Sequence, residues 1–443
     1  MSFLSLTEQD RKQMLDSIGV DSIDALFEQI PPDVRLDRPL DLEPALSEPE
    51  LVAHLTELAA RNTDTGSEIS FLGAGIYDHY VPAVVDAVLA RGEFLTAYTP
   101  YQPEMSQGVL QAIFEYQTAI CELTGMDVSN ASGYDGTTVA ADACYLAKHA
   151  RGRSRVVVAE TLNPQVRQVV KTYAPGFGLD VVEVPHSGGI TDPDDLRRAA
   201  DGAACVIFQQ PNFFGCLEPA PELASAADDA GALAVAHVDP VSLGVLEAPG
   251  AYGCALAIGE GQAAGNYQAY GGPHYGFLAA RSEYIRRMPG RISGETVDAE
   301  GRRGFVLTLQ TREQHIRREK ATSNITTNQT LLAVAGLVHL SWLGPQGLRE
   351  VGETCLALGR YAKERLSEAG FGLVFPDRAT FKEFAVRVGR PAKEAIGAAR
   401  SQGIHPGYAL GRDYPGLDDA LLIAVTEKRT TDEIDRLVEV LAA

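Results

Sequence analysis

The stretch CALAIGEGQAAGNYQAYGGPHYGFLAA, from Cys254 to Ala280, decides how the rest of the chain is interpreted. It begins with an apolar segment of strand length, continues through a glycine-rich loop, and ends in a second apolar segment. Short apolar segments on either side of such a loop predict two buried strands. The stretch contains no lysine, and Gln262 lies at the start of the loop. The sequence therefore predicts a strand–loop–strand unit without a side-chain amine.

Working outward, similar strand-like runs alternate with helical patterns along the middle of the chain. The runs are apolar on both faces, and they are VVVAE (156–160), VVEV (181–184), CVIFQ (205–209), LAVAHVD (233–239), CALAIG (254–259) and YGFLAA (275–280). Helical patterns lie between them at Pro164–Tyr173, Pro193–Ala199 and Pro221–Ala230. Strands that are apolar on both faces and joined by helices predict an α/β fold with a mainly parallel sheet covered on both sides.

The pattern changes at both ends of this region, which predicts three parts. Residues 1–70 form an arm, with two short amphipathic helices within 7–30 and an extended segment from 33 to about 48. Residues 71–327 form the large domain. Residues 328–443 form a smaller α+β domain, which contains a long helical tract to Ala369, three strand-like runs and a last helix opened by a Thr430/Glu433 capping box.

Composition narrows the class of protein and its partners. The chain has 443 residues, of which 45% are hydrophobic and 22% charged, as in an ordinary globular protein. Its formal net charge of −21 argues against nucleic acid or an anionic membrane as a partner, because both require a basic surface. Six scattered cysteines without a CxxC pair indicate reduced thiols and a cytoplasmic location, and we expect no bound metal.

Two polar clusters precede predicted helices and are candidates for anion binding. Ser132–Thr138 (SGYDGTT) places glycines and hydroxyls at a helix start, where free backbone N–H groups suit a phosphate. The segment REKATSN places hydroxyl and amide groups ahead of the long apolar helix, as an anion-binding or intersubunit loop would. These groups belong to Thr322, Ser323 and Asn324. In both places a simple N-capped helix start, with solvated polar residues, is the alternative interpretation.

A third cluster carries exposed aromatic and amide groups. Tyr98, Tyr101 and Gln102 lie in a proline-bounded loop before an amphipathic helix, and they are candidates to line a cleft. Packing of these aromatic residues against a partner subunit is an equally open interpretation. The segment FQQPNFFG (208–215) follows a predicted strand and places polar groups at the carboxyl edge of the sheet, where ligands of open α/β sheets bind.

Taken together, several long stretches resemble the α subunits of the two-chain glycine cleavage system P-proteins, which are glycine dehydrogenases (decarboxylating). The resemblance covers essentially the whole chain, and it is carried by LTEQDRKQML, DALFEQIPPDVRL, FLGAGIYDHYVP, TAYTPYQPEMSQG, QQPNFFG, GEGQ, GGPHYGF, REKATSNI and EKRTTDEIDRL. It implies the fold of the pyridoxal phosphate (PLP)-dependent transferases, which is aspartate aminotransferase fold type I.

The resemblance also implies a division of labour between two chains. In the family the PLP lysine lies in the β subunit, and alignment of the glycine-rich stretches places Gln262 at that position. We therefore expect PLP on a partner β subunit, in an α2β2 assembly that decarboxylates glycine and passes the aminomethyl group to the lipoyl arm of H-protein. Thr322, with Ser323 and Asn324, is expected to contact the partner's PLP phosphate. Asp239 resembles the carboxylate that pairs with the pyridine nitrogen, and with Tyr98, Tyr101 and Gln102 it is expected to line the cleft.

Two alternatives remain open from the sequence. One is a free-standing PLP enzyme, a decarboxylase or aminotransferase, that uses another lysine; Lys171 and Lys320 are the nearest to Gln262 in the sequence. The other is a scaffolding subunit that contributes nothing to an active site. Covalent attachment of PLP to this chain would indicate the first, and an unchanged active site after loss of the Thr322 hydroxyl would indicate the second.

Overall fold

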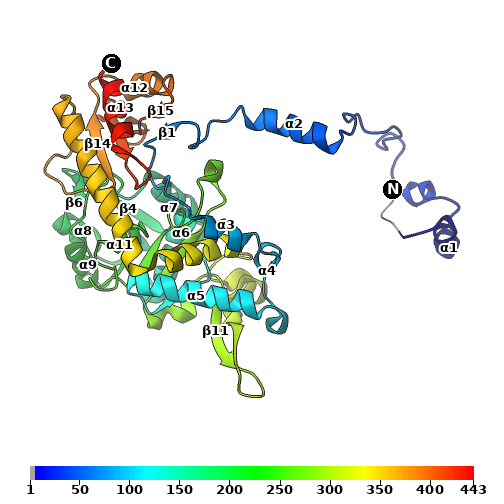
Figure 1. Cartoon of the computed structure of the whole chain (residues 1–443). Coiled ribbons are helices and arrows are strands. Elements are labelled where there is room, and N and C mark those ends of the chain that lie inside the picture. The colour runs from blue at the N-terminus through cyan, green and yellow to red at the C-terminus, as the bar shows by residue number, and fades with distance from the viewer. Residues whose placement is uncertain (1–4) are drawn as a thin grey trace. The chain divides into compact units, whose positions relative to one another are not determined.

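The computed structural model describes residues 5–443 and divides the chain into two compact units, Met1–Thr63 and Asp64–Ala443 (Figure 1). The first unit contains α1 (Glu8–Ile18), the 3-10 turn η1 (Asp24–Phe27) and α2 (Glu48–Ala59). Helices α1 and α2 begin in capping boxes and bury none of their residues. The second helix expected within residues 7–30 is wrong, because only a single 3-10 turn forms there, and α2 was not anticipated.

The second unit is built on a seven-stranded sheet of order β2-β10-β9-β8-β7-β3-β4. Neighbouring strands from β9 to β4 are parallel, whereas β10 is antiparallel to both β9 and β2. The strands are β2 (Val128–Ser129), β3 (Arg155–Ala159), β4 (Asp180–Val184), β7 (Ala203–Gln210), β8 (Leu233–Val238), β9 (Leu256–Glu260) and β10 (Gly276–Ala280). Each strand-like run expected in this region therefore forms a strand, and the mainly parallel sheet is confirmed.

Helices cover both faces of this sheet, as doubly apolar strands require. Apolar residues of α6 and α7 pack on one face, and those of α5, α8, α9 and the start of α11 pack on the other. The helices of the large domain are α3 (Ala83–Leu89), α4 (Gly92–Leu95), α5 (Gln107–Thr124), α6 (Gly136–Arg151), α7 (Pro164–Phe177), α8 (Pro193–Ala199), α9 (Ala220–Asp229) and α10 (Gln314–Arg317). Two hairpins, β5 (His186–Ser187) with β6 (Ile190–Thr191) and β11 (Ile292–Val297) with β12 (Arg303–Thr308), extend from it.

The small domain is an antiparallel sheet of order β13-β14-β17-β16 backed by helices. Its elements are β13 (Gly372–Leu373), β14 (Glu383–Arg387), β16 (Tyr408–Ala409), β17 (Ala420–Ala424), α12 (Ala392–Arg400) and α13 (Thr431–Ala442). The capping box of Thr430 and Glu433 opens α13 as expected. Strand β1 (Ile69–Ser70) pairs with β15 (Ile404–His405), and Phe71 is fully buried in the same core. The chain therefore enters its second unit through the small domain.

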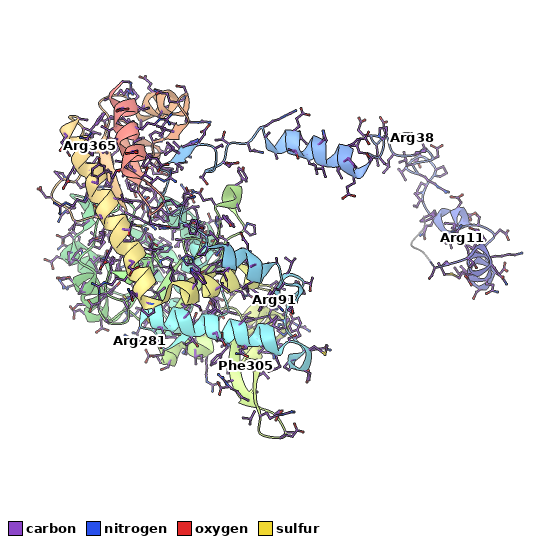
Figure 2. All side chains as sticks on the ribbon, viewed as in Figure 1. Arg11, Arg38, Arg91, Arg281, Phe305 and Arg365 are labelled. Atoms are coloured by element: carbon purple, nitrogen blue, oxygen red, sulfur yellow. The ribbon has the colours of Figure 1, made fainter. Side chains whose placement is uncertain are left out.

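Helix α11 (Thr330–Glu368) joins the two domains and confirms the long helical tract. It kinks at Gly344, where φ is 62°, just before Pro345. By length and composition it is the one described helix apolar enough to cross a membrane, yet it packs against α5, α3 and α13 inside the second unit. At its far end Arg365, labelled in Figure 2, forms an ion pair with Asp435 of α13 at 2.7 Å. We interpret α11 as the core helix of a globular protein.

Candidate functional site

The candidate site lies at the carboxyl edge of the large sheet, where β8 and β9 end side by side. Asp239 follows β8, and Gln262 follows β9 in the glycine-rich loop. The carboxylate of Asp239 accepts a hydrogen bond from the backbone N–H of Val241 at 3.0 Å, which fixes its orientation. The parallel register therefore brings together two of the residues singled out in the sequence.

Gln262 is buried and fully engaged by the backbone. Its side chain is 1% exposed, and its Oε1 accepts from the N–H of Tyr77 at 2.9 Å. Its Nε2 donates to the carbonyl oxygens of Tyr77 at 2.9 Å and Asn266 at 2.8 Å. An amide both donates and accepts, so it pairs with both backbone groups of one residue, which an ammonium cannot do. Gln262 thus attaches the loop around Tyr77 to the large sheet.

A lysine from the small domain occupies the space beside Asp239. Lys382 immediately precedes β14, and its side chain is 2% exposed. Its Nζ lies 2.5 Å from Oδ2 of Asp239 and 3.5 Å from the centre of the Tyr77 ring. A buried ammonium requires a negative partner and further acceptors, and the carboxylate and the aromatic face supply them. The hydroxyl of Tyr77 in turn donates to Glu383 at 2.6 Å.

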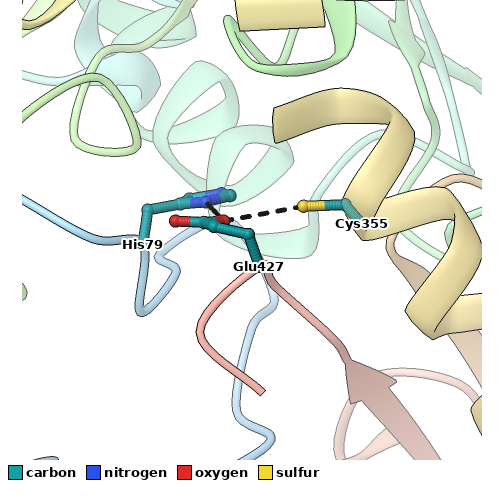
Figure 3. Close-up of side chains that lie close together, drawn as sticks. All are labelled: His79, Cys355 and Glu427. Carbon is teal, nitrogen blue, oxygen red and sulfur yellow. Dashed lines mark hydrogen bonds and ion pairs between the residues drawn. The ribbon is translucent and has the colours of Figure 1, made fainter. Parts of the chain in front are cut away.

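Next to Lys382, His79, Glu427 and Cys355 form a compact group (Figure 3). Nζ of Lys382 lies 2.8 Å from Nε2 of His79, and Nδ1 of His79 lies 2.6 Å from Oε2 of Glu427. Because an ammonium only donates, Nε2 accepts and Nδ1 carries the proton that is donated to Glu427. The thiol of Cys355 donates to the same carboxylate at 3.6 Å.

These three side chains have the atom types of a metal site, but their hydrogen bonds are already complete. Burial by itself raises the pKa of Glu427, but hydrogen bonds from His79 and from the N–H of Tyr80 lower it to about 2. Burial raises the pKa of the Cys355 thiol to about 12, which disfavours the thiolate that binds metals. A cation here would also lie beside the Lys382 ammonium. The group is better described as a hydrogen-bonded chain than as a metal centre.

Carboxylates also occupy the start of α6, where the sequence placed a possible phosphate. Oδ1 of Asp135 accepts from the N–H groups of Thr137 at 2.9 Å and Thr138 at 2.7 Å. Oε2 of Glu260 accepts from the N–H of Gly136 at 2.8 Å. Burial raises the pKa of Glu260 to about 8 despite this bond. The structure therefore shows the N-capped helix start, with side-chain oxygens on the first amides.

The side chains present do not fit pyridoxal phosphate in this chain's own cleft. The coenzyme needs a lysine amine for attachment, a carboxylate free for its ring nitrogen and free amides for its phosphate. Here Gln262 replaces the amine, and Asp239 is already paired with Lys382. The first amides of α6 are bonded to Asp135 and Glu260. None of the three requirements is therefore met, because protein groups already occupy the positions that the coenzyme would need.

The other predicted residues form a second group, around the loop that contains Thr322. Thr322 is half-buried, and within the described residues its hydroxyl has no hydrogen bond. The hydroxyl of the neighbouring Ser323 accepts from the N–H of Ile325 at 3.2 Å. Ser323 also lies near Asp142, whose pKa burial raises to about 7. Asn324 is exposed. The loop lies over the start of α6, since the N–H of Thr326 donates to the hydroxyl of Tyr134 at 3.3 Å.

Of the tyrosines at the proline-bounded loop, Tyr98 contacts this second group and Tyr101 contacts Arg291. The hydroxyl of Thr327 bonds that of Tyr98 at 3.0 Å, although Tyr98 is 72% exposed. The hydroxyl of Tyr101 accepts from Nη2 of the buried Arg291 at 2.8 Å. Gln102 is exposed. Tyr98 is therefore held by Thr327 and Tyr101 by Arg291, while Asp239 lies in the filled cleft.

Sequence reasoning missed the residues that fill the cleft. Lys382 and Glu383 interrupt the apolar run FKEFAVRV, and Tyr77 and His79 lie in FLGAGIYDHYVP. A pair of charges inside an apolar strand signals a buried ion pair, because unpaired charges are rarely buried. That signal would have singled out Lys382, whose partner in the structure is Asp239, whereas Lys171 is paired with Glu183.

Comparison with known sequences identifies the family. Residues 1–441 match the sequence profile of the family described as glycine cleavage system P-protein. A protein of Anoxybacillus flavithermus named "Probable glycine dehydrogenase (decarboxylating) subunit 1" is 50% identical over 438 residues, which is 99% of this chain and 98% of the relative. The protein of the same name from Carboxydothermus hydrogenoformans is 51% identical over 442 residues, 100% of this chain and 99% of the relative.

Solved structures agree with these relatives. A crystal structure of glycine decarboxylase (P-protein) of the glycine cleavage system, in inhibitor-bound form, has a TM-score of 0.91 and 43% identity and covers 100% of this chain and 99% of its own. Lactobacillus brevis glutamate decarboxylase has a TM-score of 0.68 at 12% identity, which indicates a shared fold alone. The fold is that of the pyridoxal phosphate enzymes of fold type I, as expected. On the full-length match and the identity of about half of all positions, this chain belongs to the glycine cleavage system P-protein family.

Proposed function

We propose that this chain is subunit 1 of a two-chain glycine decarboxylase whose second subunit carries pyridoxal phosphate. The assembly releases CO2 from glycine and transfers the remaining aminomethyl group to the lipoyl arm of H-protein. One sulfur of the lipoyl disulfide takes the aminomethyl group and the other takes a proton, so the disulfide is reduced. When bound, PLP supplies the electron sink for loss of the carboxylate. The names of the relatives, which include "subunit 1", support this assignment.

The single observation that carries the division of labour is the state of Gln262. Its amide is buried and bonded to both backbone groups of Tyr77, so it is an integrated part of the cleft. Lys382, the lysine beside Asp239 in this cleft, is held by Asp239 and His79 and is not a free amine. These contacts favour coenzyme attachment on another chain over a free-standing enzyme.

The contribution of this chain to the partner's active site is proposed to come from the loop at Thr322. The hydroxyl of Thr322 has no hydrogen bond within residues 5–443, and Asn324 is exposed, so both are available to an anion such as the coenzyme phosphate. Tyr98 lies beside the loop and exposes 72% of its surface. An α2β2 assembly in the cytoplasm, with H-protein docking transiently, completes the proposal.

Co-expression of the chain with a candidate second subunit tests the proposal. We expect the two to co-elute in size-exclusion chromatography and to catalyse glycine-dependent exchange of CO2 in the presence of lipoylated H-protein, whereas the chain alone is inactive. Borohydride reduction in the presence of PLP should label a peptide of the second subunit only. A phosphopyridoxyl peptide from this chain, or CO2 exchange without the second subunit, would contradict the proposal.

A scaffolding role is the second candidate, and one substitution separates it from a share in the active site. Thr322→Val keeps the β-branched shape of the side chain and removes its hydroxyl, so in the assembled enzyme we expect weaker PLP binding and slower turnover. Thr172→Val, on the exposed face of α7, is the matched control. Unchanged PLP affinity and turnover in the Thr322 variant would favour the scaffold.

A further inference from the structure

A continuous chain of buried polar groups crosses the junction between the large and small domains. It runs from Asp239 through Lys382 and His79 to Glu427, with successive contacts of 2.5, 2.8 and 2.6 Å. Asp239, Lys382 and His79 are buried or nearly so, and the side chain of Glu427 is 16% exposed. Cys355, on α11, approaches the end of this chain (Figure 3).

The members of this chain come from different parts of the fold. Asp239 follows β8 of the large sheet, whereas Lys382 precedes β14 and Glu427 follows β17 in the small domain. His79 lies in the segment that connects β1 with α3, so it stands between the two domains. Contact between Asp239 and Lys382 is therefore a direct link from the large sheet to the small one.

A second connection runs parallel to the first through Tyr77. Its backbone is bonded to Gln262 of the large domain, and its hydroxyl donates to Glu383 of the small domain at 2.6 Å. The ammonium of Lys382 lies over the Tyr77 ring, so the two connections share a contact. Oε1 of Glu383 also accepts from the N–H of Ala74 at 2.7 Å.

Rotation of the small domain away from the large one would break both connections at once. Asp239 and Lys382 would lose each other as partners, and a charge left unpaired in a site that is still partly buried is strongly disfavoured. Hydrogen-bonded chains in such surroundings are also cooperative, so the loss of one link weakens the next. The two domains are thus held together by buried polar groups that contact one another.

We propose that the chain Asp239–Lys382–His79–Glu427 is a clamp that locks the small domain onto the large domain in this subunit, with Lys382 filling the cleft. The clamp goes beyond the proposed function, because it is a property of this chain alone and does not depend on which subunit carries the coenzyme. It keeps this subunit closed, and the subunit then offers its partner a rigid surface.

Hydrogen–deuterium exchange of the full-length chain tests the clamp. In Lys382→Met we expect amides of residues 72–82 and 425–429 to exchange at least about tenfold faster, since removal of one member of a buried pair is strongly destabilising. Amides of β3 and β7, in the centre of the large sheet, should keep their rates. Lys393→Met, an exposed lysine on α12 of the same domain, is the matched control and should match the parent protein.

The double variant Asp239→Asn with Lys382→Met distinguishes a clamp between the domains from mere neutralisation of the Asp239 charge by Lys382. It also provides a test if the single variant does not fold. It removes both charges of the Asp239–Lys382 pair, so its thermal stability should exceed that of Lys382→Met, while the junction amides should still exchange faster than in the parent protein. Protection restored to the parent level in the double variant would overturn the proposal, as would a uniform acceleration that includes β3 and β7.

Discussion

Replacing Gln262 by lysine would return to this cleft the amine that it lacks, and the structure predicts that the change damages the protein instead of restoring a coenzyme site. Oε1 of Gln262 is the acceptor for the N–H of Tyr77 at 2.9 Å, and a lysine offers no acceptor. Its ammonium could still donate to the carbonyl of Tyr77. The substitution therefore orphans a buried donor and adds a buried charge.

The magnitude follows from these two changes. A buried N–H group left without a partner costs about 1–3 kcal/mol. Removing an ammonium from water costs several kcal/mol more unless it gains a carboxylate, and Asp239 is already paired with Lys382. We expect Gln262→Lys to lower the free energy of unfolding by roughly 4 kcal/mol or more in total. Gln262→Met, which orphans the same donor without a charge, should cost less.

Urea unfolding of the isolated chain measures this loss, and borohydride reduction with added PLP reports any covalent attachment. We expect the lysine variant to unfold at lower urea than the methionine variant and to yield no phosphopyridoxyl peptide from position 262. A lysine variant as stable as the parent protein, with a labelled peptide at that position, would refute the conclusion that protein groups already fill the cleft.

Three further outcomes are expected. Tyr77→Phe removes the donor to Glu383 and should lower the free energy of unfolding, measured in urea, by about 1–3 kcal/mol. Burial raises the folded-state pKa of Glu260 from 4.5 to about 8, so the folded state binds this proton more tightly than the unfolded state does. The free energy of unfolding should therefore fall as pH rises across this interval. Glu260→Gln should remove that part of the slope in unfolding curves recorded at several pH values. Gly215→Ala should lower the melting temperature by several degrees, because φ is +81° and the added Cβ would lie 2.0 Å from the carbonyl oxygen of Glu383.

Local patterns in the sequence predicted most of the large sheet correctly. The run LAVAHVD became β8 (Leu233–Val238), and Pro193–Ala199 became α8 with the same bounds, because strand burial and a Pro at the first helical position are local signals. The prediction of two helices within residues 7–30 was wrong. Neither expected helix has a core to pack against there, and only α1 forms. Most helical stability comes from packing, so propensity alone is a weak guide there.

The sequence by itself determined the family, the α/β fold and the missing amine at Gln262, since each depends on which residue stands at one position or on local periodicity. Only the tertiary structure decided what fills the cleft, because Asp239, Lys382 and Glu427 are far apart in the chain and meet where strands of two different sheets end. It also decided which residues hold the tyrosines at 98 and 101, namely Thr327 and Arg291. Contacts between distant segments depend on how the domains pack, and a pattern of neighbouring residues carries no record of that packing.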